Sequence, residues 1–250
     1  MDGLKATYQN ELFKIRKKKK LVVGSILSIL AVLIGQVSIT LVNQSLGLLI
    51  VNSTDLSLIV LNVMMYSIFP LFVTFLTIDM FNGEYNTNTM KLILTKPTSR
   101  FSIFTAKFLA LLTIIGLNIV FVMLLSLITS IAFNISSVTF IGIVRIIVAY
   151  TVSIVPLIVF SLFVIMIANL VKSGNSVFFL TILSFALFYV IGVFFHQASS
   201  FLFTSMFDWY RLWISDSIQF FKLLRMSLIM IGCSIMLYSI GFSLFERKVI

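Results

Sequence analysis

The sequence predicts an all-α integral membrane protein with six transmembrane helices, and three observations lead to this class. Hydrophobic residues make up 60% of the 250 residues and charged residues only 10%, compared with about 25% charged residues in a typical soluble domain. Most apolar residues fall into segments of roughly 20 residues, the length at which a helix crosses a hydrocarbon core of about 30 Å. The basic residues gather at the chain ends and in alternate connections, as expected for loops on one side of a membrane.

The first segment, residues 1–20, is predicted to form an amphipathic helix at the membrane surface, ahead of a six-span domain over residues 21–250. Apolar residues recur on one face at 100° per residue, and lysines occupy the rest of the helix. A disordered basic tail is the alternative that this composition leaves open. The predicted apolar face of this interfacial helix consists of Leu4, Tyr8, Leu12 and Ile15.

Six apolar segments have the length of a transmembrane helix. Pro70 and Pro156 lie inside the second and fourth, and each removes a backbone hydrogen bond, so both helices are expected to kink. The single cysteine, Cys233, lies in the last segment, and one cysteine forms no intrachain disulfide. The predicted spans are about 21–42, 58–78, 108–133, 146–170, 177–195 and 226–244.

The distribution of basic residues predicts a multi-pass protein of the cell membrane with both termini in the cytoplasm. With the N-terminus inside, all but four of the 18 Lys and Arg residues fall on the cytoplasmic side. The basic N-terminus directly precedes the first span, which suits contact with anionic lipid headgroups. No nucleic-acid-binding motif accompanies it, so nucleic acid is not an expected partner. The four exceptions are Arg145, Arg211, Lys222 and Arg225.

The outer segment 196–225, between spans five and six, is rich in aromatic residues but too interrupted by polar residues to span. We expect it to form one or two re-entrant or interfacial helices, with aromatic side chains at the level of the headgroups. Two roles remain open, an outer gate over an exit path and a simple interfacial anchor. One helical face is predicted to carry Phe203, Phe207, Tyr210, Ile214, Ile218 and Phe221, and the gate candidates are Phe203, Phe207, Trp209, Tyr210 and Trp213.

The residue inventory argues against catalysis by this chain. It contains no G-x-x-x-x-G-K-[ST] phosphate-binding loop. One histidine, His196, and one cysteine make a zinc site or a Ser–His or Cys–His mechanism improbable. None of the eight carboxylates falls inside a predicted span, which weighs against an ion-coupled secondary transporter. We therefore expect no catalytic residue, metal ligand or cofactor site in this chain.

The connection 79–107 is the longest polar interruption between two spans. Asp79 is unfavourable at a helix C-terminus, so the second span is expected to continue past it and end with Gly83 as C-cap. A short surface helix over Tyr85 to Leu94 is expected to follow. Pro97 ends it, because a residue before proline resists helical geometry.

Within this connection, the sequence resembles the signature loop of type-2 ATP-binding-cassette (ABC) exporter permeases. In that family an acidic residue precedes a Thr, an apolar triplet and a Pro-x-x-Arg. Where the family has Gly before the Thr, this chain has Asn88, which also tolerates left-handed geometry. The basic N-terminal helix, the six spans and the outer segment are similar too. The matching residues are Glu84, Thr89, Leu92, Ile93, Leu94, Pro97, Ser99 and Arg100.

The resemblance implies a permease subunit with a cytoplasmic coupling helix between spans two and three. Two copies of a separate cytosolic ABC ATPase would bind ATP and Mg beneath a permease dimer, formed with a second copy or a homologous permease. Export of an amphipathic or lipophilic cargo, such as a peptide or an antibiotic, is the predicted function. The alternative is a non-transporting membrane sensor or assembly component that recruits a cytosolic protein through residues 79–107. The ATPase-coupling residues implied are Glu84, Thr89, Leu92, Leu94, Pro97 and Arg100.

Overall fold

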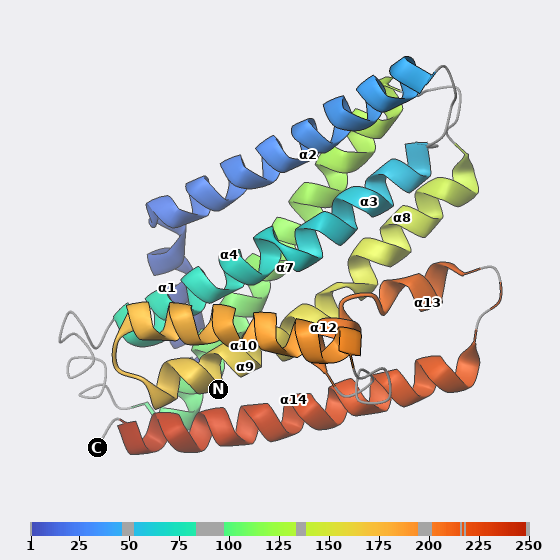
Figure 1. The fold of residues 1–250 in the computed structure, drawn as a ribbon. Helices are drawn as coiled ribbons and strands as arrows, with labels where there is room; N and C mark the ends of the chain where they lie inside the picture. Colours follow the sequence, from blue (N-terminus) through green and yellow to red (C-terminus); the bar gives the residue numbers. More distant parts are fainter. Residues whose placement is uncertain are drawn as a thin grey trace.

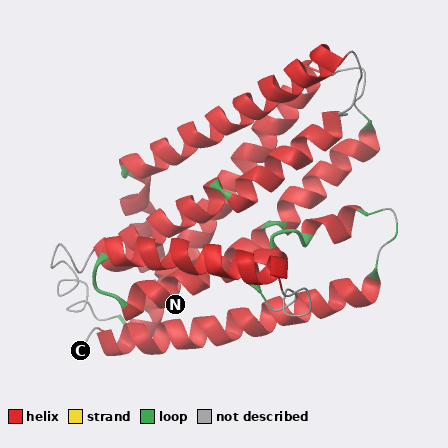
Figure 2. Ribbon diagram, viewed as in Figure 1, coloured by secondary structure: helices red, strands yellow, loops and turns green. Residues whose placement is uncertain are grey.

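A computed structural model describes most of the chain as helices, and the regular structure of the described residues contains no strand (Figure 2). This confirms the predicted all-α fold. Five helices are long and apolar enough to cross a membrane, and a sixth span results if one bent pair of helices is counted together. The structure describes residues 2–46, 53–83, 98–133, 139–194, 202–215, 217 and 219–248.

The first half of the chain forms a short helix and three long helical stretches (Figure 1). Each stretch extends beyond the corresponding predicted span at one or both ends. The stretch that contains the second predicted span consists of two α-helices and a π-helix. The elements are α1 (Asp2–Arg16), α2 (Lys19–Leu46), α3 (Ser53–Tyr66), α4 (Ile68–Thr77), the π-helix η1 (Ile78–Asn82) and α7 (Arg100–Phe133).

The second half forms three further long stretches, with two short helices between the last two. The final helix begins six residues before the predicted sixth span, in what was expected to be the outer segment. The elements are α8 (Phe140–Val152), α9 (Ile154–Leu170), α10 (Gly174–Phe194), α12 (Phe203–Met206), α13 (Tyr210–Ile214) and α14 (Phe220–Lys248).

The two predicted proline breaks are present, and both fall at the position that proline chemistry dictates. A proline ring clashes with the carbonyl four residues earlier. For Pro70 that residue is Tyr66, the last residue of α3, and the chain bends by 41° between α3 and α4. For Pro156 it is Val152, the last residue of α8.

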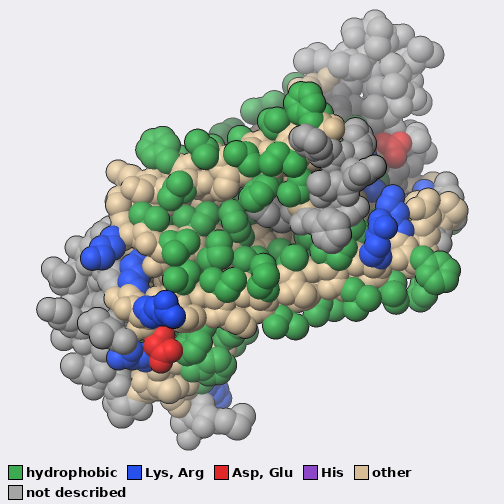
Figure 3. Space-filling view, turned by 60° about the horizontal axis from the view of Figure 1, so that its bottom comes forward, with side chains coloured by type: hydrophobic (Ala, Val, Ile, Leu, Met, Phe, Trp, Pro, Cys, Tyr) green, Lys and Arg blue, Asp and Glu red, His purple; other side chains and the backbone are tan. Residues whose placement is uncertain are grey.

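Helix α9 lies at the centre of the bundle and packs against α4, α10 and α14. The helices around it expose apolar side chains, for example Val22 on α2, Leu183 on α10 and Ile235 on α14. Figure 3 shows hydrophobic side chains over the middle of one face, with lysines and arginines gathered towards its two ends. This distribution suits a bundle surrounded by lipid, with charged residues at the two headgroup layers.

We call one end of the bundle the terminal end, because α1 and the last turn of α14 lie there (Figure 1). The start of α2, η1, the start of α7 and the turn between α9 and α10 lie at the same end. Helix α13 and the start of α3 lie towards the opposite end.

Candidate functional site

The π-helix η1 lies at the terminal end, where it contacts several other elements. It directly precedes the predicted coupling segment. Its five residues continue α4, and Gly83 donates its backbone N–H to Ile78 O. Short π-helical segments inside α-helices occur frequently at functional sites. In this chain, side chains from several elements converge on η1.

A buried ion pair connects η1 to α1 and α7. The Lys107 ammonium on α7 donates to Met80 O at 2.9 Å and to Glu11 Oε2 at 3.1 Å. Both charged side chains are buried, and Lys14 completes the group by donating to Glu11 Oε1 at 2.9 Å. A buried charge is tolerated when it is paired and hydrogen-bonded, so these contacts fix three elements relative to one another.

The pKa of Glu11 reflects this arrangement. Burial alone would raise the pKa of the carboxyl group. The charges of Lys107 and Lys14, and the hydrogen bonds from them, outweigh burial, so the pKa lies below its ordinary value. Glu11 is therefore ionised at neutral pH and pairs with a cation.

A second lysine approaches the neighbouring carbonyl of η1. Lys18, between α1 and α2, donates to Asp79 O at 3.3 Å and lies 3.5 Å from Asp79 Oδ2. Lysines from two different parts of the chain thus contact consecutive carbonyls, those of Asp79 and Met80. Cations are favourable at the carbonyl end of a helix, and Lys18 also offsets the charge of Asp79.

On its other sides, η1 contacts the turn between α9 and α10. The buried Asn82 donates through Nδ2 to Val171 O at 2.8 Å and to Lys172 O at 3.2 Å. Gly174, at the start of α10, lies so close to Ile78 that an added Cβ would be 2.7 Å from Ile78 Cγ2. The glycine therefore permits close approach of α10 to η1.

An aromatic cluster adds α14 to this junction. The ring centroids of Phe81, Phe104 and Phe245 lie 5.5 to 6.3 Å apart, a separation typical of favourable aromatic pairs. In addition, Lys248 donates to Ala168 O at 2.7 Å. We call η1 with these partners the η1 junction.

Most of the predicted coupling residues lie outside the described residues. These are Glu84, Thr89, Leu92, Leu94 and Pro97, together with the surface helix expected over Tyr85 to Leu94. Arg100 is the first residue of α7 and donates through Nη1 to Glu246 O on α14 at 3.3 Å. Gly83 is the C-cap residue of η1, as predicted, and it has right-handed helical angles, φ −58° and ψ −38°.

The predicted apolar face of the N-terminal helix packs against α7. Ile15 is buried, Tyr8 and Leu12 are partly buried against the core, and Leu4 is half-buried. The Tyr8 hydroxyl is 2.8 Å from Thr113 Oγ1 on α7. Sequence reasoning missed Glu11, which lies on this same face four residues before Ile15. An acidic residue on an apolar face was the available signal.

The predicted gate residues divide between the interior and the surface. Phe207, Trp209 and Tyr210 are buried, whereas Trp213 is exposed. The Phe203 side chain lies outside what the structure describes. The expected common aromatic face is wrong at its far end, because Phe221 belongs to α14 and is 85% exposed. The chain turns before α14, so helical spacing does not extend across that point.

Sequence reasoning also missed the role of Asp208. This residue follows α12, and its carboxylate accepts from Tyr66 at 2.8 Å and from Asn62 at 3.2 Å, both on α3. Arg211 Nε lies 3.0 Å from Asp208 Oδ1. A carboxylate expected in the outer segment thus fixes that segment to the last turns of α3, just before the break at Ser67.

The comparison with known families agrees with this architecture. Residues 7–193 match the model of a family described as ABC-2 family transporter protein. A search of curated proteins found no match. The matched range begins within α1 and ends within α10, so it includes the whole η1 junction except its α14 residues. Because the match covers more than half of the chain, this protein belongs to the ABC-2 transporter family and is a membrane subunit of that type.

Proposed function

We propose that the chain is the six-span permease subunit of an ATP-driven exporter that is energised by a separate ABC ATPase. Family membership supports a transport subunit that works with an ABC ATPase. The sequence contains no phosphate-binding loop, which suits a subunit that leaves ATP and Mg to its partner. Two ATPase copies would act on a permease dimer, formed with a second copy or a homologous permease.

The observation that carries the proposal is the convergence of contacts on η1. Residues 84–97 connect Gly83 to Thr98, so a force on this segment acts directly on the end of η1 and on the start of α7. The lysine contacts to Met80 and Asp79 would transmit displacement of η1 to α1 and α7. Asn82 would transmit it to the turn before α10. One local movement would thus reach three parts of the bundle.

The terminal end is proposed to face the cytosol. Most lysines and arginines of the sequence belong to segments that lie at this end or lead to it, and cytoplasmic loops carry an excess of both. This orientation puts both termini and residues 84–97 on the side where an ATPase has access to ATP.

An amphipathic or lipophilic cargo, such as a peptide or an antibiotic, is proposed for the exporter. The support is the aromatic outer segment and the scarcity of charge within the spans. A strongly hydrated ion would require buried ionisable partners along its path.

The proposal is tested by purifying the tagged protein from solubilised membranes and measuring ATPase activity in the eluate. Wild type is expected to retain an ATPase, and Glu84→Lys to lose most of it, because the reversal puts like charges at the contact. Asp55→Lys is the matched control, since it makes the same charge change at the opposite end and should retain the ATPase. An eluate without ATPase in every variant would overturn the proposal and leave the recruiting sensor as the alternative.

A further inference from the structure

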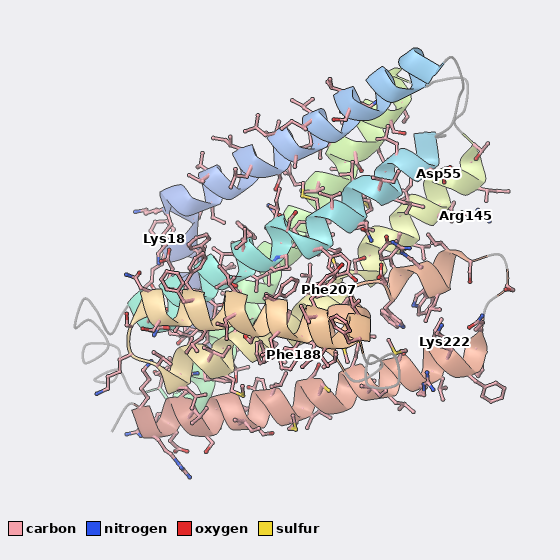
Figure 4. The ribbon with its side chains drawn as sticks, in the orientation of Figure 1. Lys18, Asp55, Arg145, Phe188, Phe207 and Lys222 are labelled. Carbon is pink, nitrogen blue, oxygen red and sulfur yellow. The ribbon has the colours of Figure 1, made fainter. Side chains whose placement is uncertain are left out.

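A pocket lined by both polar and apolar residues lies between the start of α3 and α13, at the opposite end of the bundle from the η1 junction. Its volume is about 340 Å³. Figure 4 labels Asp55 at this end of α3. The proposed export function assigns no role to this pocket. The lining residues are Asp55, Leu58, Ile59, Asn62, Tyr210, Arg211 and Ile214.

Helix α13 forms one wall of the pocket, and side-chain contacts with α3 hold it in place. The Tyr210 side chain is buried, and its hydroxyl accepts from Asn62 Nδ2 at 3.4 Å. Asp208 Oδ1 accepts from Asn62 at 3.2 Å and pairs with Arg211 Nε at 3.0 Å. The guanidinium of Arg211 is therefore oriented by Asp208, while 60% of the side chain remains exposed.

The pocket presents opposite charges together with a hydrogen-bond acceptor. Asp55 is exposed and forms no ion pair within the described part of the chain. Asn62 uses its amide nitrogen for Asp208 and Tyr210, and no described residue donates to its Oδ1. A ligand with a hydrogen-bond-donating cation and an anion would satisfy both sides, the cation at Asp55 and Asn62 Oδ1, and the anion at Arg211.

The apolar surface next to the pocket defines the rest of the ligand. Ile59 and Val63 follow Asp55 at four-residue spacing on α3 and are 43% and 52% exposed. Residues at this spacing lie one above the other on a helix face. A hydrocarbon chain that leaves the pocket along α3 would therefore cover an apolar stripe.

We propose that this pocket binds the phosphoethanolamine head of a phospholipid, whose acyl chain lies along Ile59 and Val63. A primary ammonium donates three hydrogen bonds, which matches the carboxylate of Asp55 and the carbonyl of Asn62. A trimethylammonium group donates none and is held by cages of several aromatic rings, whereas among the described residues that line the pocket a single one, Tyr210, is aromatic. The proposal does not depend on export or on an ATPase.

Native mass spectrometry of the purified full chain in detergent tests the proposal. The protein is mixed with equal amounts of phosphatidylethanolamine, phosphatidylcholine and phosphatidylglycerol that carry identical acyl chains. Wild type is expected to retain one phosphatidylethanolamine with about a tenfold preference over each of the others, the scale of one charge-assisted hydrogen bond. Asp55→Asn should abolish that preference, so that the three lipids are retained in a ratio of about one.

Glu246→Gln serves as the matched control, because it removes one exposed carboxylate at the terminal end and should leave the preference intact. Equal retention of the three lipids by wild type would overturn the proposal. So would a preference that Asp55→Asn leaves unchanged. ATPase co-purification is measured on the same samples, so that a failure of the lipid site is distinguished from a failure of the export proposal.

Discussion

At the scale of single residues, Lys107 is the most deeply buried of the described charged residues. It is fully buried, and its ammonium donates to the Glu11 carboxylate and to the Met80 carbonyl. Removal of one member of a buried pair leaves the other charge uncompensated, which costs more than the pair contributes.

Replacement of Lys107 by Met is therefore expected to destabilise the protein by about 3 to 5 kcal/mol. Thermal unfolding in detergent measures this, with Lys172→Met as control because Lys172 is exposed. In the double variant with Glu11→Gln, most of the loss should be recovered, since neither of the two buried charges remains. Additive effects of the two substitutions would contradict the proposed pairing.

Glu11 also predicts a pH dependence. Its pKa in the folded protein lies below the ordinary value of 4.5, so the unfolded chain binds the proton more readily. The ion pair therefore stabilises the fold above about pH 5, and this contribution falls as the pH drops below 4.5 through the folded pKa. Unfolding temperatures of wild type and Glu11→Gln should differ by a constant amount between pH 5 and 7 and converge as the pH falls below 4.5. A gap that widens in acid would contradict this assignment.

At the scale of elements, the close approach of α10 to η1 depends on Gly174. An added Cβ would lie 2.7 Å from Ile78 Cγ2, and a β-branched side chain has little freedom to move away. The packing of these two elements thus requires a glycine in α10.

Gly174→Ala is expected to destabilise the protein by about 1 to 3 kcal/mol, the usual effect of overpacking. The same substitution in an Ile78→Ala background should be nearly neutral, because the clashing methyl group is gone. Gly116→Ala on α7 is the control, since nothing lies within 4 Å of its added Cβ. It should be neutral or stabilising by up to about 1 kcal/mol. Equal losses for the two glycines would contradict a specific contact between α10 and η1, because higher helix propensity favours alanine at both positions.

The proline breaks were predictable at this scale, and the π-helix was not. A proline acts on the backbone within its own turn, so Pro70 and Pro156 indicate breaks from local chemistry alone. The segment Ile78–Asn82 contains no residue that requires a π-turn. The π-helix is accompanied by contacts to residues that are distant in sequence. Lys18 and Lys107 contact its carbonyls, and its Asn82 contacts the turn between α9 and α10.

At the scale of the whole molecule, six spans would put the two termini on one side of the membrane. The η1 junction would then lie on that side, and the pocket between α3 and α13 on the other. This arrangement separates the proposed site of energy input from the proposed lipid site by the full bundle.

Labelling with a membrane-impermeant maleimide in intact cells tests this arrangement. In a Cys233→Ser background, single cysteines at Lys5 and Glu246 should stay unlabelled until the cells are opened. Cysteines at Asp55 and Arg211 should label from outside. Labelling of Lys5→Cys and Glu246→Cys on opposite sides would contradict six spans.

The sequence by itself determined the fold class, the approximate spans, the breaks at the two prolines and the family. These features depend on local properties, namely hydrophobicity over about 20 residues, proline geometry and a short loop motif. The tertiary structure alone decided which polar residues in apolar surroundings meet. Glu11 and Lys107 are 96 positions apart, and Asn62 and Asp208 are 146 apart, so no local pattern pairs them. Burial makes such pairs necessary, but only the packing of α1 on α7, and of the outer segment on α3, brings them together.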